Sequence, residues 1–347
     1  MKKFLALLLA LTMVMCLFAG CGDTNTPADD TNTPTDDSST PADDADSSAT
    51  GDQKIAIIPM SLNDPYQIMM ANAAKMKCDE LGIEGVIQVP GSGSMGDIQG
   101  QVELVENIIA NGTYTGVVLA PISAEGGNIS VKNLQDAGIP VVIMDSQVDQ
   151  DALEAEGYEK VPFVGTGNLD AAINTGKWIR ENYPEGVKMA KINGADGHSN
   201  GEARKAGIDE GLDGWANIVA QQSTTWSVDD AYTATQNIIS ANPDVELIWC
   251  ACDALGIGCI RALEEAGLQG QIDVIAFDGT NDGLQQVLDG NEVANTAQFP
   301  DVMGMTSVEH VVKLINGEDV DLVFDSGHEI IVKDTAQELM DRLSKYL

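Results

Sequence analysis

The chain has 347 residues and a formal net charge of -36, from 54 acidic and 18 basic side chains. This excess of negative charge argues against a nucleic-acid-binding protein, because phosphates attract Lys and Arg, and against a protein that lies flat on an anionic membrane. With 44% apolar residues the chain has ample material for buried cores, and its length suits two folded domains.

The N-terminus has the features of a secretory signal. Lys2 and Lys3 precede an apolar run that ends at Phe18 and is too short for a membrane-spanning helix. A Cys directly after Ala-Gly resembles the signal of bacterial lipoproteins, in which that Cys is lipidated, although Phe18 stands where those signals usually carry Leu. We expect a signal peptide at 1–20 and lipidation of Cys21; the alternative is an ordinary signal with a chance Cys.

An acidic, low-complexity segment follows the signal. Residues 22–53 are almost entirely Asp, Thr, Pro, Ser, Ala and Asn, with no aromatic residue and no Lys or Arg. Such a segment cannot bury enough apolar surface to offset its ordering entropy, and its like charges extend it. We expect 21–53 to be a lipidated Cys and a disordered spacer. The folded body would then be lipid-anchored on the extracytoplasmic face of the cell membrane.

Short apolar runs alternate with amphipathic stretches through the rest of the chain. The runs lie at 54–60, 85–89, 116–120, 140–144, 162–164, 188–192, 247–250, 273–277 and 329–332. Asp64 can cap a helix that starts at Pro65 and ends at Gly82, and a second helix is predicted over 95–111, with Gly112 as its stop. This alternation predicts an α/β fold with doubly wound parallel sheets.

Polar residues recur at the carboxyl ends of the predicted strands. They are Asn63-Asp64, Asp145, His198, Asp253 and Asp278. Each alone is an ordinary helix cap or turn residue. In doubly wound folds, however, ligands bind beyond the carboxyl ends of the strands, so together these residues predict a polar cleft.

Five stretches carry a resemblance to a known family. They are 61–66 (SLNDPY), 140–145 (PVVIMD), 197–204 (GHSNGEAR), 277–283 (FDGTNDG) and 297–304 (AQFPDVMG). In this order they resemble the sugar-binding proteins of ABC importers, the type I periplasmic binding proteins that include ribose- and galactose/glucose-binding proteins. The stretch 197–204 is more similar to the galactose/glucose branch.

The resemblance implies two similar doubly wound lobes joined by three hinge crossovers near Thr166, Gln298 and Asp325. The lobes would close around a sugar without chemistry on it or any cofactor, and a monomer would then dock on an ABC permease with its ATPase. The implied division is an N-terminal lobe of 54–166 plus 298–325 and a C-terminal lobe of 167–297 plus 326–347.

The resemblance also implies a set of sugar-binding residues. A hexose needs hydrogen-bond partners for its hydroxyls and aromatic plates against its faces, which Tyr66 and Trp226 would supply. The hydrogen-bonding candidates are Asp64, Asp145, Asp253 and Asp278 as acceptors, Arg204 and His198 as donors, and Asn200 and Gln298. The alternatives are packing roles for the aromatics, helix capping for the Asp residues, a surface ion pair for Arg204 and a loop position for His198.

The chain departs from both branches at several site positions. Cys252, itself one of the implied sugar-binding residues, stands where both carry Asn. Ser146 and Gln147 replace charged residues, and Met60 and Ala120 replace polar or aromatic contacts. A galactose- or glucose-like hexose is favoured, although a deoxy sugar, a pentose or a methyl glycoside would also fit. We find no calcium loop of the galactose/glucose type and predict no metal site.

Other functions have less support. Only three histidines occur, His198, His310 and His328, and no G-x-S-x-G motif is present, which disfavours an enzyme. The signal and acidic spacer stand where a repressor of this fold would carry a basic DNA-binding motif. A component that presents its ligand to a chemoreceptor or histidine kinase is the main alternative, followed by a scaffold protein with a silent site.

The cysteines show no zinc-binding spacing. Cys250 and Cys252 lie two apart on a predicted strand and would point to one face. We expect Cys78, Cys250, Cys252 and Cys259 to be free buried thiols, with pairing as the alternative.

Overall fold

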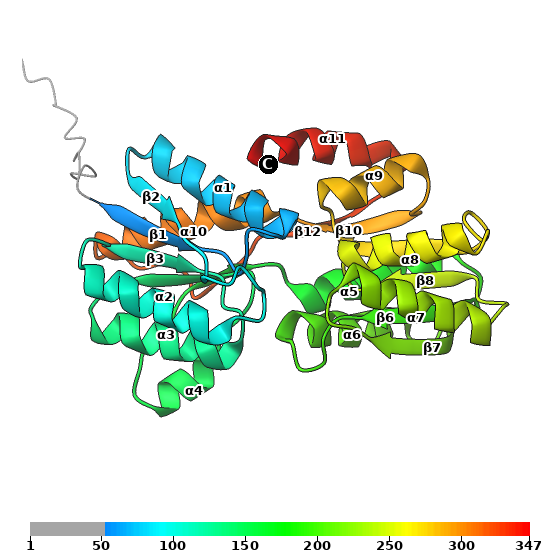
Figure 1. Cartoon of the computed structure of the whole chain (residues 1–347), viewed down its shortest axis with the longest axis horizontal. Coiled ribbons are helices and arrows are strands. Elements are labelled where there is room, and N and C mark those ends of the chain that lie inside the picture. The colour runs from blue at the N-terminus through cyan, green and yellow to red at the C-terminus, as the bar shows by residue number, and fades with distance from the viewer. Residues whose placement is uncertain (1–52) are drawn as a thin grey trace, which may run out of the picture. The chain divides into compact units, whose positions relative to one another are not determined.

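The computed structural model describes residues 53–347. The predicted signal, Cys21 and all but the last residue of the predicted spacer lie outside these residues. The described chain forms two six-stranded sheets, each flanked by helices (Figure 1). The predicted α/β doubly wound fold is therefore confirmed.

The first sheet is parallel throughout, with the strand order β11-β5-β4-β3-β1-β2. Its strands are β1 (Lys54–Ile58), β2 (Glu84–Ile87), β3 (Gly116–Leu119), β4 (Val141–Met144), β5 (Phe163–Gly165) and β11 (Val323–Asp325). Its helices are α1 (Pro65–Glu80), α2 (Ile98–Asn111), α3 (Ala124–Asp136), α4 (Gln150–Ala155) and α10 (Pro300–Ile315). Helices α1 and α10 cover one face of the sheet and α2, α3 and α4 the other, so both faces are buried.

The second sheet has the order β12-β10-β9-β8-β6-β7 and is parallel except for the β10–β12 pair. Its strands are β6 (Lys188–Asn193), β7 (Asn217–Ser223), β8 (Leu247–Cys250), β9 (Asp273–Asp278), β10 (Ala294–Gln298) and β12 (His328–Ile331). Its helical elements are α5 (Asn168–Asn182), α6 (Ser199–Leu212), α7 (Val228–Ala241), α8 (Asp253–Glu265), α9 (Asn281–Asp289), α11 (Lys333–Leu343) and the short η2 (Ser344–Tyr346).

The chain passes between the sheets three times. It leaves the first sheet after β5, returns after β10, and leaves again between the consecutive strands β11 and β12. The last turn also joins the two sets of elements, because Asn72 of α1 donates a hydrogen bond to the carbonyl of Tyr346 at 2.8 Å. Side chains of α1, α9 and α11 share one hydrophobic cluster there.

The structure bears out the local signals at the first two helices. Asp64 caps α1, with its carboxylate accepting from the backbone N–H of Tyr66, and Pro65 is the first helical residue. Helix α2 ends at Gly112, whose φ of 69° is left-handed, as predicted. The predicted start of α2 at residue 95 is wrong by three residues, because the side chain of Asp97 caps the helix and α2 begins at Ile98.

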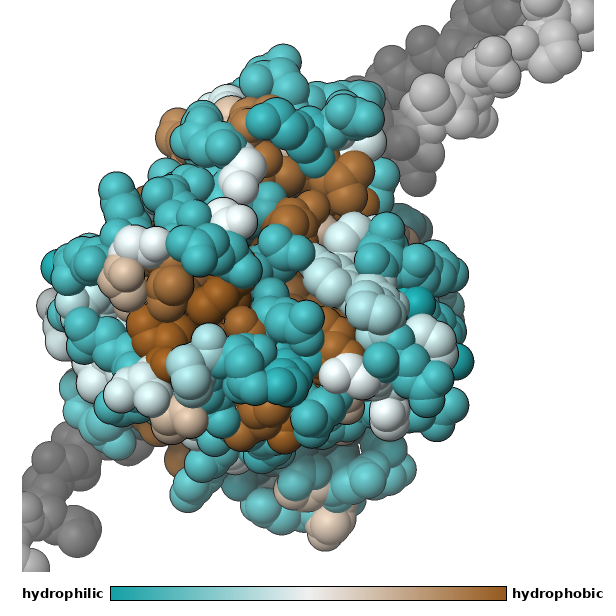
Figure 2. Space-filling view, turned by 90° about the vertical axis from the view of Figure 1, so that its right-hand side faces the viewer, coloured by the Kyte–Doolittle hydropathy of each residue, from teal (hydrophilic) through white to brown (hydrophobic). Residues whose placement is uncertain are grey.

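The four cysteines of the described chain are free and buried, as expected. Cys250 ends β8, but Cys252 is the residue that precedes α8, so the two do not share a strand. No helix in the range 53–347 is long and apolar enough to cross a membrane. Hydrophilic side chains cover most of the face shown in Figure 2, with the hydrophobic ones gathered in smaller patches.

Candidate functional site

A cavity of about 610 Å³ lies where the strands of both sheets end. All eleven predicted binding residues line it: Asp64, Tyr66, Asp145, His198, Asn200, Arg204, Trp226, Cys252, Asp253, Asp278 and Gln298. Strand order reverses between β1 and β3 in one sheet and between β6 and β8 in the other. The lining residues follow strands on both sides of each reversal. This is where doubly wound folds bind ligands.

Backbone conformation marks the same cavity independently. Within 53–347, four non-glycine residues have positive φ, and three of them line the cavity: Asp145 (66°), Trp226 (66°) and Asp278 (114°). Left-handed φ is costly for residues with a Cβ atom, and such residues concentrate at functional sites. Sequence patterns gave no sign of this strain.

On the side of the first sheet, one buried amide positions a carboxylate. Gln67 donates from Nε2 to Oδ2 of Asp145 at 2.8 Å and accepts at Oε1 from the backbone N–H of Met60 at 3.0 Å. Sequence reasoning missed Gln67. Its place three residues after the cap Asp64 predicts a capping-box contact, but its side chain instead reaches across to Asp145.

On the side of the second sheet, Arg204 and Asp278 form a buried ion pair at 3.0 Å. Arg204 also donates to the carbonyl of Ala251 and lies over the ring of Phe277, 3.9 Å from its centroid. Gln298, from β10, donates to the same Oδ1 of Asp278 at 2.7 Å. The guanidinium is thus held rigidly at the base of the cavity and is not a surface ion pair.

Asp253 has a structural role as well as a place in the cavity wall. Its Oδ2 accepts from the backbone N–H and the hydroxyl of Thr280, both at 2.7 Å, and its Oδ1 accepts from Asn295 at 2.6 Å. These bonds tie the start of α8 to the β9–α9 turn and to β10. The neighbouring Cys252 thiol lines the cavity but makes no side-chain cap to the helix.

Two aromatic side chains face the cavity from opposite sides. Tyr66 is buried at the start of α1, whereas Trp226 is half-buried and packs edge-on against His198, with ring centroids 5.4 Å apart. The indole of Trp226 lies close over Gly194, where an added Cβ would approach it to 2.0 Å. Only glycine at this turn leaves room for the ring.

Asn200 joins the two sides of the cavity directly. From α6 it donates to the hydroxyl of Ser146 at 3.2 Å and to the Asp145 carboxylate at 3.4 Å, both at the end of β4. Of the five departures from the two branches, Cys252, Ser146 and Met60 line the cavity. Gln147 is exposed outside the cavity lining, and Ala120 is buried in the core below it.

Burial makes the acids of the cavity hard to ionise. It raises the pKa of Asp64 and of Asp145 to about 6 each, and the negative charge of Asp278 adds to both shifts. The pKa values of Asp253 and Asp278 are also raised, mainly by burial. Burial, with the charge of Arg204, lowers the pKa of His198, which favours its neutral form.

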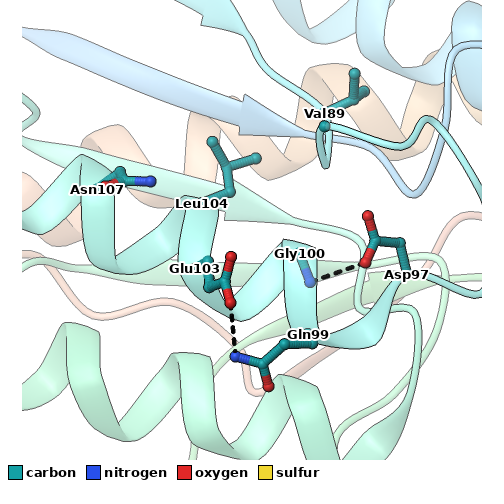
Figure 3. Close-up of a pocket in the computed structure, with 8 residues that line it drawn as sticks. Val89, Asp97, Gln99, Gly100, Glu103, Leu104 and Asn107 are labelled. Atoms are coloured by element: carbon teal, nitrogen blue, oxygen red, sulfur yellow. Dashed lines mark hydrogen bonds between the residues drawn. The ribbon is translucent and has the colours of Figure 1, made fainter.

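A second hollow of about 490 Å³ lies along α2 (Figure 3). Its polar groups make local contacts: Asp97 accepts from the backbone of Gly100 and from Ser92, and Gln99 donates to Glu103. These are capping and surface contacts, so the cavity between the sheets is the better candidate site.

The profile of the periplasmic binding protein domain family matches residues 55–319, most of the chain. The chain belongs to this family. It is a family of binding proteins and not of enzymes, as the sequence predicted. The resemblance to type I periplasmic binding proteins is therefore confirmed.

Characterised relatives of this periplasmic binding protein include two from Escherichia coli K12. The D-allose-binding periplasmic protein is 29% identical over 269 residues, which is 77% of this chain and 86% of that protein. The ribose import binding protein RbsB is 27% identical over 288 residues, which is 83% of this chain and 93% of that protein.

A solved structure shows the same fold. It is an ABC transporter periplasmic solute-binding protein from Actinobacillus succinogenes 130z with bound D-allose. It superposes with a TM-score of 0.78 at 28% identity, over 82% of this chain and 99% of that one.

Proposed function

We propose that this periplasmic binding protein captures a monosaccharide in the cavity between its two sheets and delivers it to an ABC permease. The observation that carries the proposal is the cavity lining. Two aromatic side chains, Tyr66 and Trp226, face a space that also holds carboxylate, guanidinium and amide groups. Apolar plates combined with charged hydrogen-bond partners are what a sugar ring requires.

The proposed ligand is a hexose. The cavity suits a small ligand, and the relatives include a protein named for D-allose. A galactose- or glucose-like hexose is the specific form favoured by the similarity of 197–204 to that branch. Each of the eleven lining residues predicted from sequence is proposed to contact the sugar or to hold a residue that does.

The proposed mechanism is closure of two lobes, with 54–166 and 298–325 in one and 167–297 and 326–347 in the other. Asn200, Ser146 and Asp145 would link the lobes in the closed form. We further propose that the protein acts as a monomer on the extracytoplasmic face of the membrane, held by lipid on Cys21.

A thermal-shift screen of the purified protein against pentoses, hexoses, deoxy sugars, methyl glycosides and polyols tests the ligand class. A sugar at 100 times its dissociation constant stabilises the folded state by about 2.7 kcal/mol, which moves the unfolding midpoint by several degrees. Calorimetry on each hit gives the affinity. A screen in which no sugar shifts the midpoint would overturn the proposal.

Replacement of the proposed lipidation site tests the anchor. Cys21→Ala removes the thiol that would carry the lipid, so the protein should move from the membrane fraction to the soluble extracytoplasmic fraction. Cys78→Ala, at a buried cysteine of α1, is the matched control and should leave the distribution unchanged. Membrane retention of Cys21→Ala would contradict lipidation.

A further inference from the structure

The cavity holds more negative than positive charge. Among the described residues that line it, the acids are Asp64, Asp145, Asp253, Asp278 and Asp282, whereas Arg204 and His198 are the only basic ones. Arg204 already pairs with Asp278, and His198 has a lowered pKa. One guanidinium therefore faces five carboxyl groups.

Three of these acids form what we call the carboxylate cluster: Asp64, Asp145 and Asp278. Of the other two, Asp282 is exposed at the rim, and Asp253 accepts at both carboxylate oxygens, from Thr280 at Oδ2 and from Asn295 at Oδ1. The hydrogen bonds to Asp64 and Asp278 in the described chain are made at Oδ1. In the cluster, the charges of Asp278 and Asp64 both disfavour ionisation of Asp145. The members come from opposite sides of the cavity, so closure concentrates like charge around the ligand position.

A buried amide oxygen in the same wall also lacks a partner. Gln298 is 1% exposed, and its Nε2 is committed to Asp278. Its Oε1 has no hydrogen-bond partner within the described residues. An unmet buried acceptor is costly, so a ligand that brings a hydrogen-bond donor to this wall would be favoured.

We propose that the ligand is an amino sugar, a monosaccharide in which a protonated amine replaces one hydroxyl group, with the ammonium held by the carboxylate cluster. This inference rests on the proposed monosaccharide-binding function. An ammonium brings three donors, no acceptor and one positive charge, which matches the excess of acceptors and negative charge in the cavity. The indole face of Trp226 also favours a cation nearby.

A metal ion is the other cation to consider. Within 53–347, however, no group of three or more His, Cys, Asp or Glu side chains is arranged to hold one. The cluster surrounds a ligand-sized space rather than a single coordination point, so an organic cation fits it better.

Calorimetry at pH 7 and low salt tests the inference. D-Glucose, D-galactose, D-allose and D-ribose would be compared with the 2-, 3- and 6-amino-deoxy forms of glucose and galactose. At least one amino sugar should bind about tenfold tighter than its hydroxyl parent, and N-acetylation, which removes the charge, should abolish that advantage. The advantage should also shrink as salt is added.

The outcomes separate the two proposals. Binding of neutral sugars with no gain for any amine form would overturn the amino-sugar inference and leave the proposed function standing. If no sugar of either kind binds, the proposed function and the inference fail together.

A charge-removing variant tests the role of the cluster itself. Asp64→Asn keeps an oxygen that can accept from the N–H of Tyr66, so the cap of α1 is retained. It should weaken binding of the amino sugar about tenfold and of its neutral parent much less. Asp79→Asn, at an exposed acid of the same helix, should change neither. Equal losses for both sugars from Asp64→Asn would overturn the inference.

Discussion

At the scale of single residues, Asp278 is where the polar contacts of the site meet. It accepts from Arg204 and Gln298, and its charge raises the pKa values of Asp64 and Asp145. Its own φ of 114° shows that the fold holds it in a costly backbone conformation. Because these four side chains bond to Asp278 or respond to its charge, a substitution of Asp278 should strongly change ligand binding.

We expect Asp278→Asn to weaken sugar binding by about 2–5 kcal/mol, because it leaves the buried guanidinium of Arg204 without its counter-ion. Calorimetry measures the loss. Asp282→Asn, at the exposed rim of the same cavity, is the matched control and should bind almost as the unmodified protein does. Equal affinities for the two variants would refute the central role of Asp278.

The second residue-scale prediction concerns the indole. Trp226→Ala should cost about 1–3 kcal/mol of sugar binding, by analogy with other aromatic stacking losses. Gly194→Ala should also weaken binding, because its Cβ would displace the ring while leaving it in the protein. Unchanged calorimetric affinity in Trp226→Ala would rule out stacking.

At the scale of elements, the carboxylate of Asp253 joins three segments of the second sheet. It bonds to Thr280 at the start of α9 and to Asn295 of β10 while lying at the start of α8. Its hydrogen bonds thus hold together the turns that carry Cys252 and Asp278 into the cavity. Sequence reasoning offered helix capping for Asp253, but Cys252 is the N-cap of α8, and the Asp253 carboxylate bonds to Thr280 and Asn295 instead.

Asp253→Ala should therefore lower the free energy of unfolding by about 1–3 kcal/mol, since it leaves the buried donors of Thr280 and Asn295 without their acceptor. Urea denaturation followed by circular dichroism measures this loss. Asp289→Ala, at an exposed acid of α9, should have little effect. If the two variants were equally stable, Asp253 would have to act on the ligand alone.

At the scale of the whole molecule, the cavity acids couple stability to pH. Asp64 and Asp145 have folded-state pKa values of about 6, above the ordinary value of 3.8. Between these values the folded state binds more protons than the unfolded state, so stability falls as pH rises. The stabilisation from these two groups is fully present below about pH 4 and lost as pH rises through 6.

Thermal unfolding of the ligand-free protein should accordingly show a higher midpoint at pH 5 than at pH 7. The double variant Asp64→Asn/Asp145→Asn should reduce this difference, because its amides do not titrate. Asp79→Asn/Glu103→Gln removes as many acids from α1 and α2 outside the cavity between the sheets and should keep the difference. If the double cavity variant kept the same difference in unfolding midpoint between pH 5 and pH 7, Asp64 and Asp145 would not be the source of the pH dependence.

The sequence by itself determined the fold class, the family and eleven of the residues that line the cavity. Buried parallel strands read as continuous apolar runs, and eight parallel strands were found this way, together with the antiparallel β12. Three strands were missed because they lack that pattern: β7 and β11 are largely exposed, and β10 is a buried strand of small and polar residues. Gln298 of β10 was found only through the family resemblance.

Only the tertiary structure decided how those side chains work together. Gln67 reaches Asp145 across 78 residues of sequence, and Asn200 reaches Ser146 across 54. The positive φ of Asp145 and Trp226 and the desolvation of the acids likewise depend on contacts between distant segments. Charge balance, burial and backbone strain depend on what closes around a residue, which local sequence patterns do not encode.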